Sequence, residues 1–256
     1  MHSDKRSGEG GRAGEAGPVS VIWHDVECGG YDADLPLWRE LAADAGGPIL
    51  EVGAGTGRVA LDLARHGHAV TALDHDPELL AALRERAGDL RVDTLVADAR
   101  DFELGRRFAL CLVPMQTVQV LGGVAGRRRF WRCGRAHLEP GALLAAAIAA
   151  QLAPSRPERG DEPPLPDVRE HEGWVYASQP VAIRPQRQAT VIERLRQAVA
   201  PDGTRTERRD VVRLDRLDAV TAAAEAAGAG FAALAPREVP PTPDHLGSQV
   251  VMLRAS

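Results

Sequence analysis

Three alternating glycines stand where a short apolar run gives way to a helical pattern. They are Gly53, Gly55 and Gly57, in the stretch ILEVGAGTGRVALDLARHG at 49–67. Glycine lets a ligand approach the backbone closely, and the free N–H groups at a helix start attract a polar ligand group. A tight turn without a ligand needs only one glycine. The motif therefore favours a site for a nucleotide-like ligand.

The glycine spacing and one acidic residue distinguish between possible ligands. The dinucleotide fingerprint GxGxxG places its third glycine three positions after the second, whereas here the gap is two and Arg58 follows. Glu51 lies two residues before the first glycine, where an acid suits a cationic ligand better than a pyrophosphate. A nicotinamide-dependent oxidoreductase is therefore the weaker alternative. Its Tyr-x-x-x-Lys pair is also missing, because Lys5 is the only lysine.

Two further acids end apolar runs that follow the glycine motif. Asp74 stands in ALDHD and Asp98 in VADARDF. A carboxylate can accept hydrogen bonds from two neighbouring hydroxyl groups at once. Each acid also fits a structural role. Asp74 could cap the helix that begins at Pro77, and Asp98 could be a turn residue. Their joint placement at strand ends favours a ligand site.

The elements that position these residues alternate in type. Apolar runs predict strands over 49–52, 69–74, 92–97, 108–113 and 142–149, and helical spacing predicts helices over 31–45, 58–66, 77–87 and 127–138. Strands that are apolar on both faces and alternate with helices are typical of a parallel sheet covered on two sides. We therefore expect an α/β, doubly wound, mostly parallel sheet.

After residue 150 the pattern changes to long strands predicted over 174–183, 189–199 and 204–214, with APDGT as a hairpin turn. A helix at 217–227 and strands at 231–235 and 249–253 end the chain. The predicted division is a disordered tail (1–18), an N-terminal lid helix (19–46), an α/β core (47–150), a Pro-rich loop (151–170), an antiparallel β insertion (171–214) and a return to the core (215–256).

Composition excludes several classes of function. The 256 residues carry a net charge of −5, which gives no field to attract nucleic acid or an anionic membrane. Three widely spaced cysteines form neither a disulfide framework nor a CxxC zinc pair. No apolar run approaches 18 residues. We expect a soluble cytoplasmic protein that binds no metal, nucleic acid or membrane. The arginines at 127–129, 132 and 135 fit the solvated face of one helix.

LEVGAGTG resembles the first motif of class I S-adenosylmethionine-dependent methyltransferases of the small-molecule type, over roughly 48–150 and again over 215–255. The resemblance implies a Rossmann-like seven-stranded sheet with a final antiparallel strand, and S-adenosylmethionine as cofactor with S-adenosylhomocysteine as product. It places Asp74 on the ribose hydroxyls, Asp98 by the adenine amino group, and Glu51 near the methionine amino group. The predicted cofactor-binding residues are Glu51, Gly53, Ala54, Gly55, Gly57, Asp74, His75, Asp98, Ala99 and Val113.

The segment LVPMQTVQVL at 112–121 lacks the Asn/Asp-Pro-Pro-aromatic motif of enzymes that methylate base amines. Cys111 precedes Pro114 inside an apolar strand, which predicts a core residue and not a cytosine-methylating nucleophile. The resemblance implies instead a small-molecule acceptor and in-line displacement at nitrogen or oxygen without a metal. A non-methylating S-adenosylmethionine-binding regulator or partner subunit stays open as an alternative function. The resemblance also implies that the antiparallel insertion either covers the mouth of the active site or builds a dimer contact, which leaves a homodimer open.

Three residues are candidates for the catalytic site. Gln116 follows the fourth predicted strand, Tyr31 could close over the sulfonium from the lid, and His245 could accept a proton from the loop at 239–249. Each has a structural alternative: helix capping for Gln116, core packing for Tyr31 and simple exposure in a loop for His245. The other histidines, including His24 and His171, stand isolated in the sequence, so no obligatory base is predicted.

Overall fold

The computed structural model describes residues 19–149, 164–242, 245 and 247–256. The predicted tail and most of the predicted Pro-rich loop lie outside these residues. Two helices, α1 (Val19–Cys28) and α2 (Leu35–Ala45), precede the sheet. Within the described part of the chain, no helix is both long and apolar enough to cross a membrane.

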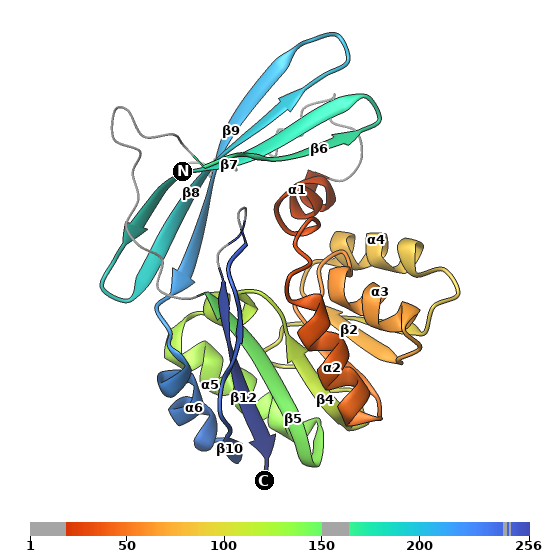
Figure 1. The fold of residues 1–256 in the computed structure, drawn as a ribbon, viewed down its shortest axis with the longest axis vertical. Helices are drawn as coiled ribbons and strands as arrows, with labels where there is room; N and C mark the ends of the chain where they lie inside the picture. Colours follow the sequence, from red (N-terminus) through yellow and green to blue (C-terminus); the bar gives the residue numbers. More distant parts are fainter. Residues whose placement is uncertain (1–18, 150–163, 243–244, 246) are drawn as a thin grey trace, which may run out of the picture.

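The main sheet alternates with helices as the sequence predicts (Figure 1). Its first elements are β1 (Ile49–Val52), α3 (Arg58–Arg65), β2 (Val70–Asp74), α4 (Pro77–Ala87), β3 (Val92–Val96), β4 (Phe108–Val113), the 3-10 helix η1 (Thr117–Val120), α5 (Gly123–Ala136) and β5 (Leu138–Ala149). The chain returns to this sheet through α6 (Ala219–Ala227), β10 (Phe231–Ala233), β11 (Arg237–Val239) and β12 (Ser248–Ala255).

The strand order is β10-β12-β5-β4-β1-β2-β3, with the short β11 paired to β12. The strands from β3 to β5 run parallel, whereas β12 is antiparallel to β5. The prediction of a doubly wound, mostly parallel sheet with an antiparallel final strand is therefore confirmed. Because β1 lies between β2 and β4, the residues that follow these three strands meet at one edge of the sheet.

Each face of the sheet has its own core. One apolar cluster joins α2, α3 and α4 to the sheet through residues such as Trp38, Leu63 and Leu80, and the other joins α5 and α6 through residues such as Trp131 and Ala222. Strands buried on both faces are rich in apolar residues, which is why β1 and β4 begin and end where the sequence predicts, although β1 also buries Glu51. Strand β5, by contrast, starts at Leu138 and not at 142 as predicted. Its first residues pair with β4 across a shift in register between Phe108 and Leu110.

A second, antiparallel sheet lies across one end of the core (Figure 1). It contains β6 (Asp167–His171), β7 (Trp174–Pro185), β8 (Ala189–Val199) and β9 (Arg205–Asp215). Strand β6 occupies the last part of the stretch predicted as a loop. Tyr176 packs edge-on against Trp23 of α1, with 5.5 Å between ring centroids, and Trp174 stacks on Tyr176. These two aromatic residues therefore hold the sheet against α1.

A buried arginine joins the second sheet to the core. Arg127 of α5 is 3% exposed and donates to Glu225 at 2.7 and 2.8 Å and to Asp215 at 2.9 Å. The Gln119 side chain donates to the Asp215 carbonyl and accepts from the N–H of Ala149. The expectation that Arg127 belongs to a solvated helix face is wrong, because its two acidic partners arrive from distant parts of the sequence.

Candidate active site

The glycine loop between β1 and α3 is packed too closely for larger residues. Gly53 and Gly55 have φ values of 75° and 55°, in the left-handed region that favours glycine. A Cβ atom on Gly53 would lie 2.5 Å from the Thr117 side chain, and one on Gly55 would lie 2.1 Å from His24 Nε2. Gly57 caps α3 and faces Leu83. The loop is therefore held between α1 and the turn after β4.

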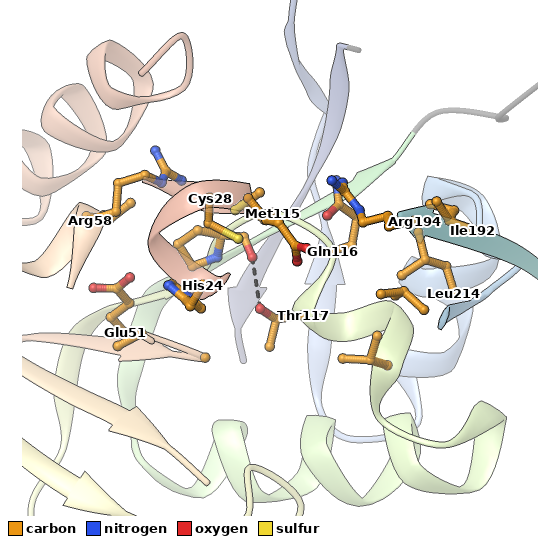
Figure 2. A pocket seen from close by; sticks show the side chains of 17 residues that line it. His24, Cys28, Glu51, Arg58, Met115, Gln116, Thr117, Ile192, Arg194 and Leu214 are labelled. Atoms are coloured by element: carbon orange, nitrogen blue, oxygen red, sulfur yellow. Dashed lines mark hydrogen bonds between the residues drawn. The ribbon is translucent and has the colours of Figure 1, made fainter. Parts of the chain in front are cut away.

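A cavity of about 250 Å³ opens beside this loop (Figure 2). It is bounded by α1, the glycine loop, the β4–η1 turn and one face of β8 and β9. The residues lining it are His24, Glu27, Cys28, Glu51, Gly53, Ala54, Arg58, Val59, Pro114, Met115, Gln116, Thr117, Val120, Ile192, Arg194, Val212 and Leu214.

Glu51 gives this cavity a buried acid. Its side chain is 2% exposed, and its Oε2 atom has no hydrogen-bond partner among the described residues. Burial raises the pKa of Glu51 to about 8, although the nearby Arg58 guanidinium opposes the shift. A buried carboxyl with an unused oxygen is matched to a cationic hydrogen-bond donor. The ammonium group of a bound methionine moiety has this chemistry, so the residues present fit S-adenosylmethionine.

Asp74 ends β2 and braces the glycine loop. Its Oδ2 atom accepts from the Gly55 N–H at 2.8 Å, and its Oδ1 atom accepts from the Asp76 N–H at 3.0 Å. Each carboxylate oxygen can accept a further hydrogen bond, so binding a pair of ribose hydroxyls stays compatible with these contacts. The neighbouring His75 is 87% exposed, with Nδ1 3.1 Å from Asp74 Oδ1.

Asp98 lies beyond the end of β3 and is paired within its own turn. The Arg100 guanidinium donates to both carboxylate oxygens, at 2.6 to 3.1 Å, and the Arg100 N–H adds a further hydrogen bond. The Arg100 side chain thereby lowers the pKa of Asp98 to about 2. Ala99 and Val113 are buried in the apolar core. None of these three residues lines the cavity.

Of the three predicted catalytic residues, one lines the cavity and two lie outside its lining. Gln116 lines the cavity next to Met115, whose φ of 54° is a strained value for a residue other than glycine. Tyr31 and His245 lie together outside the cavity lining, with 5.1 Å between ring centroids. Arg58 stacks over the Tyr31 ring and forms a two-pronged ion pair with Asp34.

His24 is not isolated in the fold. Its Nδ1 atom lies 3.2 Å from the Thr56 hydroxyl, which donates to Asp25 at 2.8 Å. Asp25 in turn accepts two hydrogen bonds from the Arg86 guanidinium, at 2.8 and 2.6 Å. The sequence separates these residues by up to 62 positions, so no local pattern brings them together. The structure places His24 in the wall of the cavity, where sequence reasoning expected no partner.

The second sheet supplies one wall of the cavity, through residues that the sequence analysis did not name. Ile192 and Arg194 come from β8, and Val212 and Leu214 from β9. Both pairs are spaced two residues apart, so each pair points to one face of its strand. Ile192 and Val212 are direct neighbours in the β8–β9 register. The alternation was visible in the sequence, but the register and the face that meets the cavity were not.

Comparisons with known proteins agree with this geometry. Residues 49–141 match the family described as a methyltransferase domain. None of the curated proteins compared with the chain matches it. Among solved structures, the chain is similar to CalS10, a SAM-bound amino pentose methyltransferase from Micromonospora echinaspora, with 23% identity and a TM-score of 0.69 over 95% of this chain and 100% of that one.

Two further structures share the fold. The sugar N-methyltransferase KedS8 from Streptoalloteichus is 22% identical, with a TM-score of 0.68 over 100% of this chain and 99% of that one. The glycopeptide N-methyltransferase MtfA, in complex with S-adenosylmethionine, is 22% identical, with a TM-score of 0.59 over 87% of each chain. Residues 49–141 therefore match a methyltransferase domain, and the chain as a whole has the fold of solved S-adenosylmethionine-dependent methyltransferases.

Proposed function

We propose that the protein transfers the methyl group of S-adenosylmethionine to an amino nitrogen of a small molecule. The observation that carries this proposal is the continuity of the cavity. Its lining runs from Glu51 and Gly53, beside the glycine loop, to Ile192 and Leu214 on the second sheet. One end therefore suits the cofactor, and the other end suits an acceptor of modest size.

Two acids at the glycine loop suit the methionine and ribose parts of S-adenosylmethionine: Glu51 lines the cavity, and Asp74 lies behind the loop outside the cavity lining. Glu51 would accept from the methionine ammonium, and Asp74 would accept from the ribose hydroxyls while keeping its contact with Gly55. The glycine loop would let the cofactor approach the backbone. When bound, the cofactor supplies a methyl group on a positively charged sulfur. Asp98, Ala99, Val113 and His75 stay predictions as contacts of the adenosine part.

The acceptor end supports a partly apolar molecule. Pro114, Met115 and Val120 line the cavity together with apolar side chains of β8 and β9, and Arg194 adds a cation from β8. The protein's task is to hold the accepting atom in line with the methyl group, and such alignment lowers barriers by roughly 7–11 kcal/mol in the best model systems. Gln116 lies in the cavity wall, where its amide could hydrogen-bond the acceptor.

The names of the similar structures support nitrogen over oxygen as the accepting atom. KedS8 is a sugar N-methyltransferase and MtfA a glycopeptide N-methyltransferase. An amine also needs less help than a hydroxyl group, because its lone pair is nucleophilic once the ammonium has lost a proton. A cytoplasmic location and a homodimer stay predictions.

The test is methyl transfer to matched pairs of acceptors. The full chain is incubated with S-adenosylmethionine and a panel of amino sugars, such as glucosamine, each paired with the sugar that has a hydroxyl group at the same carbon. We expect S-adenosylhomocysteine and a product 14 Da heavier from amino sugars only. Methylation confined to the hydroxyl partners contradicts the proposal. Cofactor binding without turnover on any member favours the non-methylating regulator instead.

A matched pair of variants assigns the activity to this site. Asp74→Asn removes the charge that braces Gly55, whereas Asp89→Asn changes an exposed acid in the turn after α4. We expect the first variant to lose most of its activity at low cofactor concentration and the second to keep it. Equal behaviour of the two variants would place the cofactor elsewhere.

A further inference from the structure

We propose that His24 is the base that takes a proton from the acceptor's ammonium group before methyl transfer. This inference rests on the proposed function, because it needs an amine acceptor. It comes from a chain of three side chains, Asp25, Thr56 and His24, that ends in the wall of the cavity. His24 would thus be a catalytic residue supplied by α1, outside the methyltransferase domain match.

The hydrogen bonds determine which nitrogen of His24 carries the proton. The Thr56 hydroxyl has a single proton, and it donates that proton to the Asp25 carboxylate at 2.8 Å. The same oxygen can therefore only accept from His24, so Nδ1 must be the protonated nitrogen. In the neutral ring, Nε2 then has a free lone pair. This is the arrangement of an oriented base, in which a second group, here the Thr56 hydroxyl, fixes the ring through a hydrogen bond to its other nitrogen.

The free nitrogen packs against the glycine loop that would hold the cofactor. The Nε2–Cε1 edge of the ring lies over Gly55, 2.1 and 2.4 Å from the position that a Cβ atom would take. His24 lines the same cavity as Glu51 and Thr117, as Figure 2 shows. A ring that served only to anchor α1 would not need an edge in this cavity.

The charges around His24 favour a neutral ring that is readily protonated during the reaction. Burial lowers the pKa of His24, and Arg86 of α4 acts in the same direction. Asp25 and Glu27 on α1, together with Asp74 after β2, act in the opposite direction. Burial raises the pKa of Asp25, but the hydrogen bonds from Arg86 and Thr56 outweigh it, so Asp25 stays ionised. That charge stabilises an imidazolium through the Thr56 hydroxyl.

The proposed step balances without any further reactant. The acceptor R–NH₃⁺ gives a proton to His24 Nε2, leaving R–NH₂ and the imidazolium. The nitrogen lone pair then forms the N–C bond, and the C–S electron pair goes to sulfur. The products are R–NH₂⁺–CH₃ and the neutral thioether, and His24 afterwards loses its proton to water.

The test variant is His24→Asn, because asparagine keeps an N–H donor near the Nδ1 position and removes Nε2. The matched control is His68→Asn, which lies before the start of β2, away from the edge that bears the cavity. General-base catalysis contributes roughly 10²–10⁴-fold. With an amine that the wild type methylates and whose ammonium pKa is about 9 or higher, we expect His24→Asn to lower kcat by at least about 10²-fold at pH 7. The affinity for S-adenosylmethionine, measured by calorimetry, should change less than about threefold.

The pH dependence separates a base from a structural residue. Without the base, the variant depends on acceptor molecules that are already deprotonated, and their fraction rises tenfold per pH unit below the acceptor's own pKa. The deficit of His24→Asn should therefore shrink by about tenfold per pH unit. A deficit that stays constant with pH, or a parallel loss of cofactor affinity, overturns the proposal.

A measurement without turnover covers the case in which the variant folds poorly. Nitrogen-15 NMR of the imidazoles in the wild-type full chain, without cofactor, should show His24 protonated at Nδ1 only at pH 7. The Thr56→Val variant should release this preference. A ring protonated at Nε2 overturns the inference. If the wild type binds the cofactor but methylates no amine, the proposed function is wrong. If the wild type is active and the activity deficit of His24→Asn does not change with pH, only the inference about His24 is wrong.

Discussion

Replacing Glu51 by glutamine should make the cofactor-free protein more stable and the cofactor-bound complex weaker. The carboxyl lies in the cavity wall at 2% exposure, with one oxygen unpaired in the described structure. Glutamine has nearly the same shape and cannot ionise. The variant therefore removes the cost of a buried acid together with its attraction for a cation.

The magnitude of the stability change follows from the pKa of Glu51. Burial raises that pKa from 4.5 to about 8 in the folded chain. The folded state thus holds its proton more tightly than the unfolded state does, and the wild type loses stability as the pH rises from about 4.5 towards 8. At pH 7 the accumulated loss is ~3 kcal/mol. Glu51→Gln should recover much of this loss at pH 7 and almost none at pH 4.

The effect on binding has the opposite sign. A hydrogen bond between charged groups contributes roughly 1.5–3 kcal/mol, so its loss should weaken S-adenosylmethionine binding by about tenfold to a hundredfold. Binding of the ammonium group should also ionise Glu51 and release up to about one proton at pH 7. Calorimetry in buffers with different ionisation enthalpies measures this release, which should be absent in Glu51→Gln.

Urea unfolding at pH 4, 7 and 8 gives the free energy of unfolding for the wild type, Glu51→Gln and the control Glu139→Gln. Glu139 is exposed near the start of β5, at the opposite edge of the sheet. The reasoning is refuted if Glu51→Gln is less stable than the wild type at pH 7. It is refuted equally if the variant binds S-adenosylmethionine with wild-type affinity.

Three further predictions follow from other parts of the structure. Asp74→Asn should weaken S-adenosylmethionine binding by roughly tenfold or more by calorimetry, since the bond from Gly55 loses its charged acceptor; unchanged affinity would contradict the assignment. Arg127→Ala leaves the partly buried Asp215 and Glu225 without their cation and should lower the free energy of urea unfolding by roughly 1–3 kcal/mol, against less than about 0.5 for exposed Arg128→Ala. Gly126→Ala would put Cβ 1.7 Å from the Leu121 carbonyl oxygen and should lower the melting temperature sharply, whereas Gly30→Ala meets no atom within 4 Å.

The sequence alone predicts the parts of the fold that depend on local patterns. The run at 49–52 is bounded by a glycine motif, and the run at 77–87 begins with Pro77 in its first turn, so both were placed to the residue. The residue that caps this helix is Asp76, not Asp74 as the structural alternative supposed. Apart from Glu51, which is buried in β1, their residue types match the local structure, which is the condition under which sequence patterns are informative. The strand order then follows from the methyltransferase resemblance.

The remaining parts depend on contacts between distant segments. Helix α1 falls within the predicted lid segment at 19–46 but was not predicted as a separate helix, because its apolar face is completed by Tyr176 and Ala198 of the second sheet. The burial of Arg127 requires Asp215 and Glu225. These pairings are set by tertiary packing, which no window of neighbouring residues contains.

The candidate site shows the same division. Glu51, Gly53, Ala54 and Gln116 were selected from motifs, and all four line the cavity. Tyr31 and His245 were also selected, but the fold packs their rings against each other beyond the cavity lining. His24 was set aside because its partner Thr56 is 32 residues away. A side chain's partners decide its chemistry, and those partners are a property of the fold.

The most direct test of the account is a calorimetric titration of S-adenosylmethionine, S-adenosylhomocysteine and NADH into the full chain at pH 7. The account predicts saturable binding of the first two ligands, accompanied by proton release, and no binding of NADH. If the folded chain binds neither S-adenosylmethionine nor S-adenosylhomocysteine, the cavity beside the glycine loop is not a cofactor site and the central claim is contradicted.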